Sequence, residues 1–354
     1  MGNKTISLRQ LLSLLFAALF PLCTERLPSR TASAGGAGWL CPLLAGAAAI
    51  GILALLCRRP LLGQANLTEG KGWQTKPLTA LFLLWTLFLA SGHGARIGSR
   101  LSDALRASPV LLGLAVLALA AWMAAGGLPS FARACEIFAL AVGAGFLLIA
   151  VFGVFRLRGE YLVLFSMEEV GAVPGRALSV LGTAAVGVCA LFFLGDVTPE
   201  KGGRDILLRR TGGFFLMVSL SMLLVLGRFG PALTGKITRP FFQMASGLGL
   251  EGAFQRLEEV ASALWLLGDG ALLGLLLLTA RRLAASLLGR QETAGQTWGL
   301  AGLAFLGSIP TGFWNGILAG DFLPFCNLLA GAVGLIWTAF SGISKKSKKL
   351  EKKG

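Results

Sequence analysis

The sequence predicts an all-α integral membrane protein with about ten transmembrane helices. Its 354 residues are 55% hydrophobic and 14% charged, with a mean hydropathy of +0.74. Because a soluble domain carries roughly 25% charged residues, this chain lacks the polar surface that keeps a fold in water. Its 49 glycines and 13 prolines suit membrane helices, in which small residues let backbones approach closely.

Ten apolar stretches account for the expected helices, since crossing about 30 Å of hydrocarbon takes roughly 20 apolar residues. The first stretch is short and contains Pro21, and the ninth is interrupted by Pro310 and Asn315. We expect residues 1–343 to form one transmembrane domain. In chain order the stretches are 8–23, 38–57, 75–93, 108–127, 134–155, 176–195, 211–230, 259–280, 297–318 and 322–341.

The net charge of +15 is distributed as in a membrane protein rather than a nucleic-acid-binding one. Basic residues fall at the ends of apolar runs and in the tail 344–354, SKKSKKLEKKG. With both termini in the cytoplasm, most of the 32 Lys and Arg residues lie on the inner side, and the tail lies beside anionic lipid. Arg96, Arg100 and Arg106 weaken this bias, because we expect them in one outer loop. The prediction is a multi-pass cell-membrane protein that contacts lipid and binds no nucleic acid.

The first stretch has a second interpretation. Lys4 and Arg9, the run LLSLLFAALF and the segment ASA at 32–34 resemble the three regions of a secretory signal peptide. Cleavage would leave nine spans and place the new N-terminus outside. We expect the segment to remain a membrane helix, because the helices of a polytopic chain can direct insertion without a removable signal.

Motifs of catalytic or metal sites are absent from the sequence. It contains no G-x-S-x-G, H-E-x-x-H or P-loop pattern, and its single histidine, His93, is expected at an outer membrane boundary. The six cysteines are dispersed without a C-x-x-C spacing, so we interpret them as small hydrophobic residues. We therefore expect neither an enzyme nor a bound cofactor.

Polar residues inside the spans are candidates for function, since a carboxylate at mid-membrane costs on the order of 2.5–3.5 kcal/mol on insertion scales. Asp269 is the deepest, and it shares a helix face with Trp265, four residues earlier. It is expected either to couple to an ion or to hydrogen-bond a neighbouring helix. Arg133 and Glu136 begin the fifth span and are expected to form either a gate-like latch or a local ion pair.

Two helices contain residues that allow a local break. Gly182, Thr183 and Gly187 in the sixth span would permit an unwound stretch whose backbone groups bind a solute, and Pro21 offers a break in the first span. Paired interruptions in the first helix of each half are typical of transporters built from inverted repeats. Ten spans divide evenly into five and five.

Several segments also resemble one known family, in the same order along the chain. The most specific block contains Leu233, Thr234, Pro240, Arg256 and Trp265. Further matching segments are ISLRQLLSLLF at the N-terminus, Trp39, and GLPSFARACEIF with its Arg133 and Glu136. The chain is similar over nearly its whole length to the spore germination permease family, the B-type (GerAB-type) subunits of nutrient-germinant receptors. That family belongs to the amino acid–polyamine–organocation superfamily.

The resemblance implies a LeuT-like fold of two inverted five-helix repeats, 1–155 and 176–343, with discontinuous first and sixth helices. It implies a nutrient pocket at mid-membrane, between the first, third, sixth and eighth helices. It also implies assembly with A-type and C-type partner subunits in the inner spore membrane. By helix position the expected pocket residues are Pro21, Trp85, Thr183 and Gly187, with Asp269, Arg133 and Glu136 as coupling or gating groups.

Residues 231–258 are then expected to form an amphipathic outer loop between the seventh and eighth helices. In AFQRLEEVASALW, Phe254, Leu257, Ala261 and Leu264 would share one apolar face. A segment of this kind lies on the bundle as a lid, which explains why it is neither a span nor a solvated loop.

The sequence departs from the family at positions that matter for the ligand. The first helix reads FPLCTE where a glycine is usual, and Ala37 replaces an aspartate. The sixth helix reads Gly187-Val188 where Gly-Glu is usual, so an acidic pocket group is missing. Three functions stay open: a germinant-receptor subunit, which we favour; a stand-alone proton- or sodium-driven transporter of amino acids or polyamines, which Asp269 favours slightly; and a scaffold that has lost its pocket.

Overall fold

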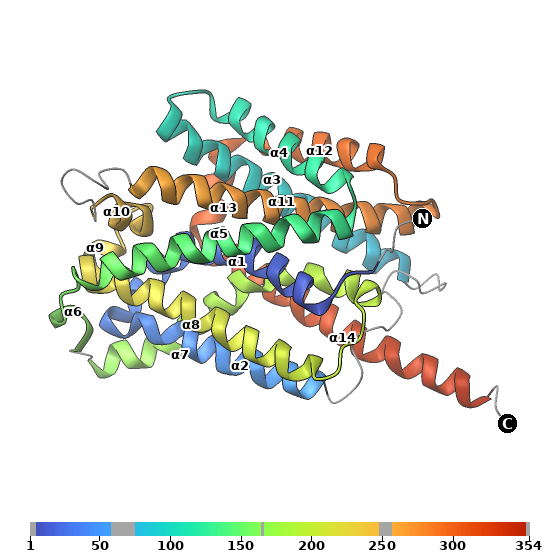
Figure 1. Ribbon diagram of the computed structural model, residues 1–354, viewed down its shortest axis with the longest axis horizontal. Coiled ribbons are helices and arrows are strands. Elements are labelled where there is room, and N and C mark those ends of the chain that lie inside the picture. Colours follow the sequence, from blue (N-terminus) through green and yellow to red (C-terminus); the bar gives the residue numbers. More distant parts are fainter. Residues whose placement is uncertain (1–4, 58–74, 164–165, 248–256, 352–354) are drawn as a thin grey trace.

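The computed structural model describes residues 5–57, 75–163, 166–247 and 257–351, which form a bundle of helices (Figure 1). These ranges contain no β-strand, and an isolated bridge joins Ile6 to Val197. The elements are α1 (Leu8–Thr31), η1 (Ala32–Trp39), α2 (Leu40–Leu56), α3 (Thr75–Leu105), α4 (Pro109–Ala125), α5 (Leu128–Val154), α6 (Glu160–Val163), α7 (Met167–Ala184), η3 (Ala185–Asp196), α8 (Gly203–Phe229), α9 (Pro231–Thr234), α10 (Pro240–Ser246), α11 (Leu257–Leu288), α12 (Ala294–Ser308), α13 (Thr311–Ala319) and α14 (Phe322–Glu351).

The helix ends follow from local chemistry. Ser7 and Gln10 form a capping box at the start of α1, and Thr293 and Gln296 form another at the start of α12. Ser166 caps α7 by accepting a hydrogen bond from the backbone N–H of Glu169. These caps satisfy backbone N–H groups that have no partner inside the helix, so the helices begin where the sequence supplies them.

Six helical segments in the described ranges are long and apolar enough to cross a membrane. The first joins α1, η1 and α2 in one run. Large apolar side chains of α4 and α5 point outward, among them Trp122, Ile137 and Leu140, as expected of surfaces that face lipid. The six segments are Leu8–Leu56, Thr75–Asp103, Leu128–Val154, Met167–Asp196, Gly203–Phe229 and Val260–Leu288, and shorter apolar helices occupy Pro109–Ala125 and Phe322–Trp337. The chain is therefore an all-α protein with the helices of a multi-pass membrane protein.

Each of the ten stretches predicted from hydropathy overlaps a helical segment, and several helices are longer than predicted. Helix α1 continues to Thr31 and α3 to Leu105, past charged residues that had been expected to lie outside the membrane. The expected interruption at Pro310 is confirmed, because it separates α12 from α13. Helix α14 continues from the tenth stretch into the basic segment as far as Glu351, and residues 352–354 of that segment lie outside the described ranges.

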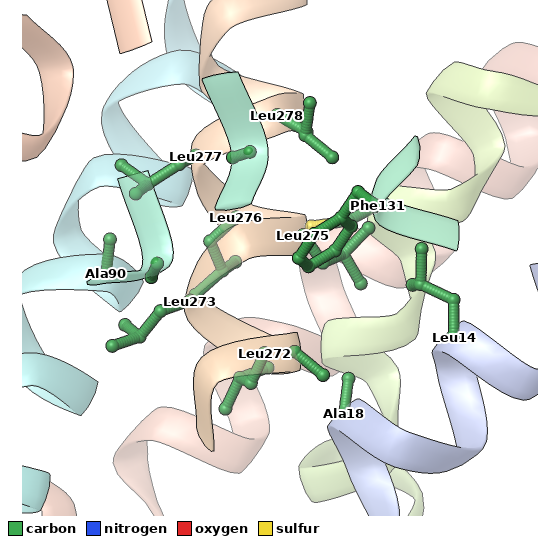
Figure 2. Packing of buried hydrophobic residues seen from close by; sticks show 14 of the residues in the cluster. Leu14, Ala18, Ala90, Phe131, Leu272, Leu273, Leu275, Leu276, Leu277 and Leu278 are labelled. Carbon is green, nitrogen blue, oxygen red and sulfur yellow. The ribbon is translucent and has the colours of Figure 1, made fainter. Parts of the chain in front are cut away.

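Helix α11 runs through the middle of the bundle, in contact with α1, α3, α4 and α5. Leu272 to Leu278 of α11 pack between Leu14 and Ala18 of α1 on one side and Ala90 of α3 on the other (Figure 2). Gly268 lets α11 lie directly against α1, since a side chain there would overlap Pro21 and meet the carbonyl oxygen of Ala17 at 2.8 Å. The first predicted stretch is thus part of the core.

The expected breaks in the first and sixth helices take different forms. Helix α1 passes through Pro21 without interruption, and the non-helical residues in this region are Ala34 and Gly35 of η1, the second with a φ of 58°. In the sixth span, α-helix gives way to 3₁₀ structure at Ala185, two residues after Thr183, and this structure continues through Gly187 to Asp196. The sixth span therefore changes helix type without an unwound stretch at Gly187, and the break predicted at Pro21 is absent.

The segment predicted to form an outer loop, residues 231–258, begins with two short helices that pack on the bundle. Helix α10 contacts α1, α5, α8 and α11 through Phe241, Met244 and Ala245, which are all buried. In Figure 1, α9 and α10 lie at the end of the bundle opposite the start of α1 and the end of α14. Residues 248–256, including the predicted Phe254 and Arg256, lie outside the described ranges. The part that is described covers the bundle end as a lid would.

Candidate functional site: a buried charge network beside a polar cavity

Four charged side chains from three helices meet inside the bundle. Arg96 of α3 pairs with Glu25 of α1 at 2.7 Å and with Asp269 of α11 at 3.0 Å. Arg100, one turn along α3, pairs with the same Glu25 at 3.0 Å and with Asp269. The four side chains are between 2% and 6% exposed. We call Glu25, Arg96, Arg100 and Asp269 the buried charge network.

The network is electrically neutral, because it pairs two guanidinium groups with two carboxylates. Arg96 and Arg100 are four residues apart, which places both on one face of α3. Each arginine bridges the two carboxylates, so the network ties α3 to both α1 and α11. Because a buried ion without a partner is strongly unfavourable, removing any one of the four leaves an uncompensated charge.

Aromatic rings of α10 and of the N-terminal part of α11 cover this network. Trp265 is fully buried and stacks on Phe241 with ring centroids 4.9 Å apart. Its indole N–H donates to the hydroxyl of Thr24 at 2.8 Å. Arg100 lies 5.6 Å from the ring centroid of Phe242, within the range of a cation–π contact. Arg239, just before α10, pairs with Asp103 at 2.9 Å. Residues 231–247 are therefore attached to α3 as well as to α11.

A cavity of about 20 Å³ lies beside the network, between α1, α3, the junction of α7 with η3, and the start of α14. This volume holds one or two water-sized groups. Four of the lining residues are apolar and five are polar or charged, and no carboxylate is among them. The lining residues are Leu22, Arg26, Arg30, His93, Thr183, Val186, Leu323, Pro324 and Asn327.

Hydrogen bonds connect several of the polar lining residues to their surroundings. Arg30 donates to the hydroxyl of Thr183 at 3.5 Å and to the carbonyl of Gly320 at 2.9 Å. Asn327 accepts a hydrogen bond from the indole N–H of Trp85 at 3.3 Å. His93 is 3% exposed, and neither of its ring nitrogens has a hydrogen-bond partner among the described residues. A buried imidazole without a partner beside a cavity is unusual, because buried polar groups are normally hydrogen-bonded.

At the other end of the bundle, ion pairs and backbone contacts hold the helices together. Arg282 of α11 pairs with Asp196 and, at 3.0 Å, with Glu292. Ile6, before α1, donates its backbone N–H to Asp196 at 2.9 Å and accepts one from Thr198 at 2.9 Å. The end of η3 is thus fastened to both α11 and the segment before α1.

The residues predicted to form a pocket have different positions. Thr183 lines the cavity. Trp85 reaches it indirectly, through Asn327. Pro21 packs against Gly268 instead of lining the cavity, and Gly187 adjoins the lining residue Val186 while facing Leu19 of α1. The structure thus places Thr183 at the cavity and Trp85 beside it.

The predicted coupling or gating residues separate into two groups. Asp269 belongs to the buried charge network, so its neighbours are arginines on α3. Glu136 accepts a hydrogen bond from the side chain of Gln10 at 3.4 Å, and Arg133 is exposed. Val188, where the family carries an acid, is buried against the position of Gly334 on α14 and does not line the cavity.

Sequence reasoning missed several charged residues of the site. Arg96 and Arg100 are buried in α3, and their predicted position in an outer loop is wrong. His93 is also buried, on the same helix, and its place at the membrane boundary stays a prediction. The available signal was the spacing of Arg96 and Arg100 on one helix face, directly after an apolar run. That spacing identifies a charged face but not the carboxylates that meet it.

Comparison with known proteins assigns no family. No protein-family model matches the chain, and no curated protein is significantly similar to it. The argument for function therefore rests on the sequence resemblance and on the site.

Proposed function

We propose that this chain is the permease-like membrane subunit of a spore nutrient-germinant receptor, which binds a small nutrient of the amino acid class and signals through partner subunits. The observation that carries the proposal is the polar cavity between α1, α3, the α7–η3 junction and α14 of the helix bundle. Enclosed sites between helices, lined by apolar residues and a few polar groups, are the usual form of small-ligand sites.

The proposal includes a ten-span LeuT-like arrangement. Its first repeat would comprise α1, α2, α3, α4 and α5, and its second α7 with η3, α8, α11, α12 and α14. Support comes from the overlap of each predicted stretch with a helical segment, and from the change of helix type at Ala185. The break in the first helix, which such folds use for binding, is not part of the proposal for this chain.

Ligand binding would be linked to a change in helix arrangement. A cavity of about 20 Å³ has room for one or two water-sized groups, too little for a whole amino acid. A bound nutrient would therefore favour a state in which α1 and α14 lie farther apart, and partner subunits would respond to that shift in population. The A-type and C-type subunits are the proposed partners. In this arrangement both termini are cytoplasmic, and the membrane is the inner spore membrane if the organism sporulates.

Substitution of Thr183 tests the binding site. Thr183→Leu replaces a cavity hydroxyl by a larger apolar group, so we expect loss of the nutrient response while the protein still accumulates in the membrane. Thr183→Ser keeps the hydroxyl and is the matched control. Germination, or ligand-dependent thermal stabilisation of the purified protein against a panel of amino acids, provides the measurement. An unchanged response in Thr183→Leu would contradict the assignment of this cavity.

A stand-alone secondary transporter is the second candidate, and the buried carboxylates Glu25 and Asp269 favour it because intramembrane acids often serve ion coupling. Uptake of labelled amino acids or putrescine into vesicles that contain this protein alone would select the transporter. Nutrient binding without uptake, together with co-purification of A-type and C-type subunits, would select the receptor.

A further inference from the structure

We propose that the cavity is an anion subsite, formed by Arg26 and Arg30 of α1 with His93 of α3, which holds the carboxylate of the nutrient or a free anion such as chloride. Binding of a nutrient carboxylate rests on the proposed function, whereas binding of chloride does not. The inference stands on three observations: the composition of the lining, the local charge, and the unpartnered histidine.

The lining supplies donors and positive charge. Arg26, Arg30 and Asn327 bring N–H groups to the cavity, and Thr183 brings a hydroxyl. None of the nine lining residues is acidic. Guanidinium groups bind carboxylates through charge-assisted hydrogen bonds, which are among the stronger polar contacts in proteins. A cationic ligand such as a polyamine would meet like charge on this surface.

The cavity brings two cationic side chains together beside a neutral network. The buried charge network pairs two arginines with two carboxylates, and Arg26 and Arg30 lie at the cavity next to it. Arg30 interacts favourably with Asp321, and Arg26 with Glu25, and neither of these carboxylates lines the cavity. An anion in the cavity would therefore meet guanidinium groups directly.

The histidine points to a ligand independently of the charge. Both ring nitrogens of His93 are buried at the cavity and have no hydrogen-bond partner among the described residues. A neutral imidazole carries one N–H donor, and that donor would complete the contacts of an anion. The cavity of about 20 Å³ accommodates a group the size of a halide or a carboxylate head.

Thermal stability of the full chain in lipid nanodiscs tests the subsite. Sodium chloride and sodium acetate are titrated against sodium isethionate, a bulkier sulfonate without a carboxylate, at constant ionic strength. We expect chloride and acetate to raise the melting temperature and isethionate not to. Arg30→Gln should raise the half-saturating chloride concentration about ten-fold, the effect of losing one charge-assisted hydrogen bond. The control Arg209→Gln removes an exposed arginine of α8 outside the cavity and should change that concentration less than about two-fold.

Two comparisons separate the sources of the anion and guard against misfolding. Each amino acid that stabilises the protein is compared with its amide, which lacks the carboxylate, and putrescine serves as a cationic probe. Stabilisation by the acid but not the amide, with competition by chloride, supports the carboxylate source. Stabilisation by chloride and acetate but by no amino acid supports the subsite and contradicts the nutrient function.

Other outcomes overturn the subsite. Equal stabilisation by an amino acid and its amide, with unchanged binding in Arg30→Gln, would leave the nutrient function standing and remove the anion subsite. Equal melting temperatures of the wild type in chloride, acetate and isethionate would remove it as well. That comparison needs no variant, so it decides the question even if Arg30→Gln does not fold, and His93→Gln provides a second variant.

Discussion

At the scale of single residues, the site consists of charges that a membrane interior does not tolerate alone. Glu25, Arg96, Arg100 and Asp269 are buried together, and each carboxylate contacts both arginines. Such a network is a poor source of net stability compared with apolar packing, yet it is very sensitive to the loss of one member. This asymmetry distinguishes it from the exposed pair of Arg176 and Asp321.

Glu25→Gln tests the network. The substitution leaves two arginines facing Asp269 alone, so we expect a loss of about 3–5 kcal/mol in stability. Thermal unfolding of the purified protein in detergent provides the measurement. The double variant Glu25→Gln with Arg96→Gln restores charge balance between Arg100 and Asp269 and should recover part of the loss.

The exposed pair supplies the control for this experiment. Arg176→Gln should change stability by no more than about 1 kcal/mol, since surface ion pairs contribute little. If Glu25→Gln also changes stability by no more than about 1 kcal/mol, the four buried charges do not depend on one another as their geometry indicates.

At the scale of elements, glycines decide how closely the helices that enclose the cavity can approach. A side chain at Gly182 of α7 would overlap the carbonyl oxygen of Pro324 at the start of α14. A side chain at Gly268 of α11 would overlap Pro21 of α1. Pro324 lines the cavity, so the contact between α7 and α14 sets part of its wall. The contact at Gly182 is with the backbone of Pro324, whereas the contact at Gly268 is with the proline ring and the carbonyl oxygen of Ala17, and glycine allows both close approaches.

Gly182→Ala tests the packing of α7 against α14. The added methyl group must push α14 away, because the backbone carbonyl it meets cannot rotate aside, and we expect a loss of about 1–3 kcal/mol in stability. Gly175→Ala on the same helix meets no atom within 4 Å, so it should leave stability unchanged or raise it by about 0.5–1 kcal/mol through helix propensity. Melting temperatures of the two variants should therefore move in opposite directions. Equal shifts would show that the close approach of the two helices does not limit the fold.

At the scale of the whole molecule, the two ends of the bundle are closed by different means. At one end α10 covers the buried charge network with Phe241 and Phe242. At the other end Ile6 and Arg282 hold the end of η3. The two ends are therefore held by different contacts, aromatic packing at one and an ion pair with backbone hydrogen bonds at the other.

Cysteine labelling tests the proposed orientation of the bundle. Lys236, between α9 and α10, and Lys201, between η3 and α8, are both exposed. With both termini in the cytoplasm, Lys236→Cys should react with a membrane-impermeant maleimide on intact cells. Lys201→Cys should react only after permeabilisation, since its loop lies beside Ile6 through the contacts of Val197 and Thr198. The unsubstituted protein measures the background from the native cysteines. Labelling of Lys201→Cys on intact cells would indicate the opposite orientation, with residues 231–247 in the cytoplasm.

The sequence by itself determined the class of this protein and the positions of its helices. Hydropathy identifies each apolar stretch because about 20 neighbouring residues carry the signal, and Pro310 marks a helix end by its missing N–H. The helix break that the sequence predicted at Pro21 is wrong, because α1 continues through this proline, which packs against α11.

Only the tertiary structure decided the site. Arg96 lies 71 residues from Glu25 and 173 from Asp269 along the chain, so no local pattern joins them. The same holds for Arg30 and Thr183, which are 153 residues apart and meet at the cavity. Hydropathy places a charged residue outside the membrane unless a partner of opposite charge is known, and partners become known only when helices pack.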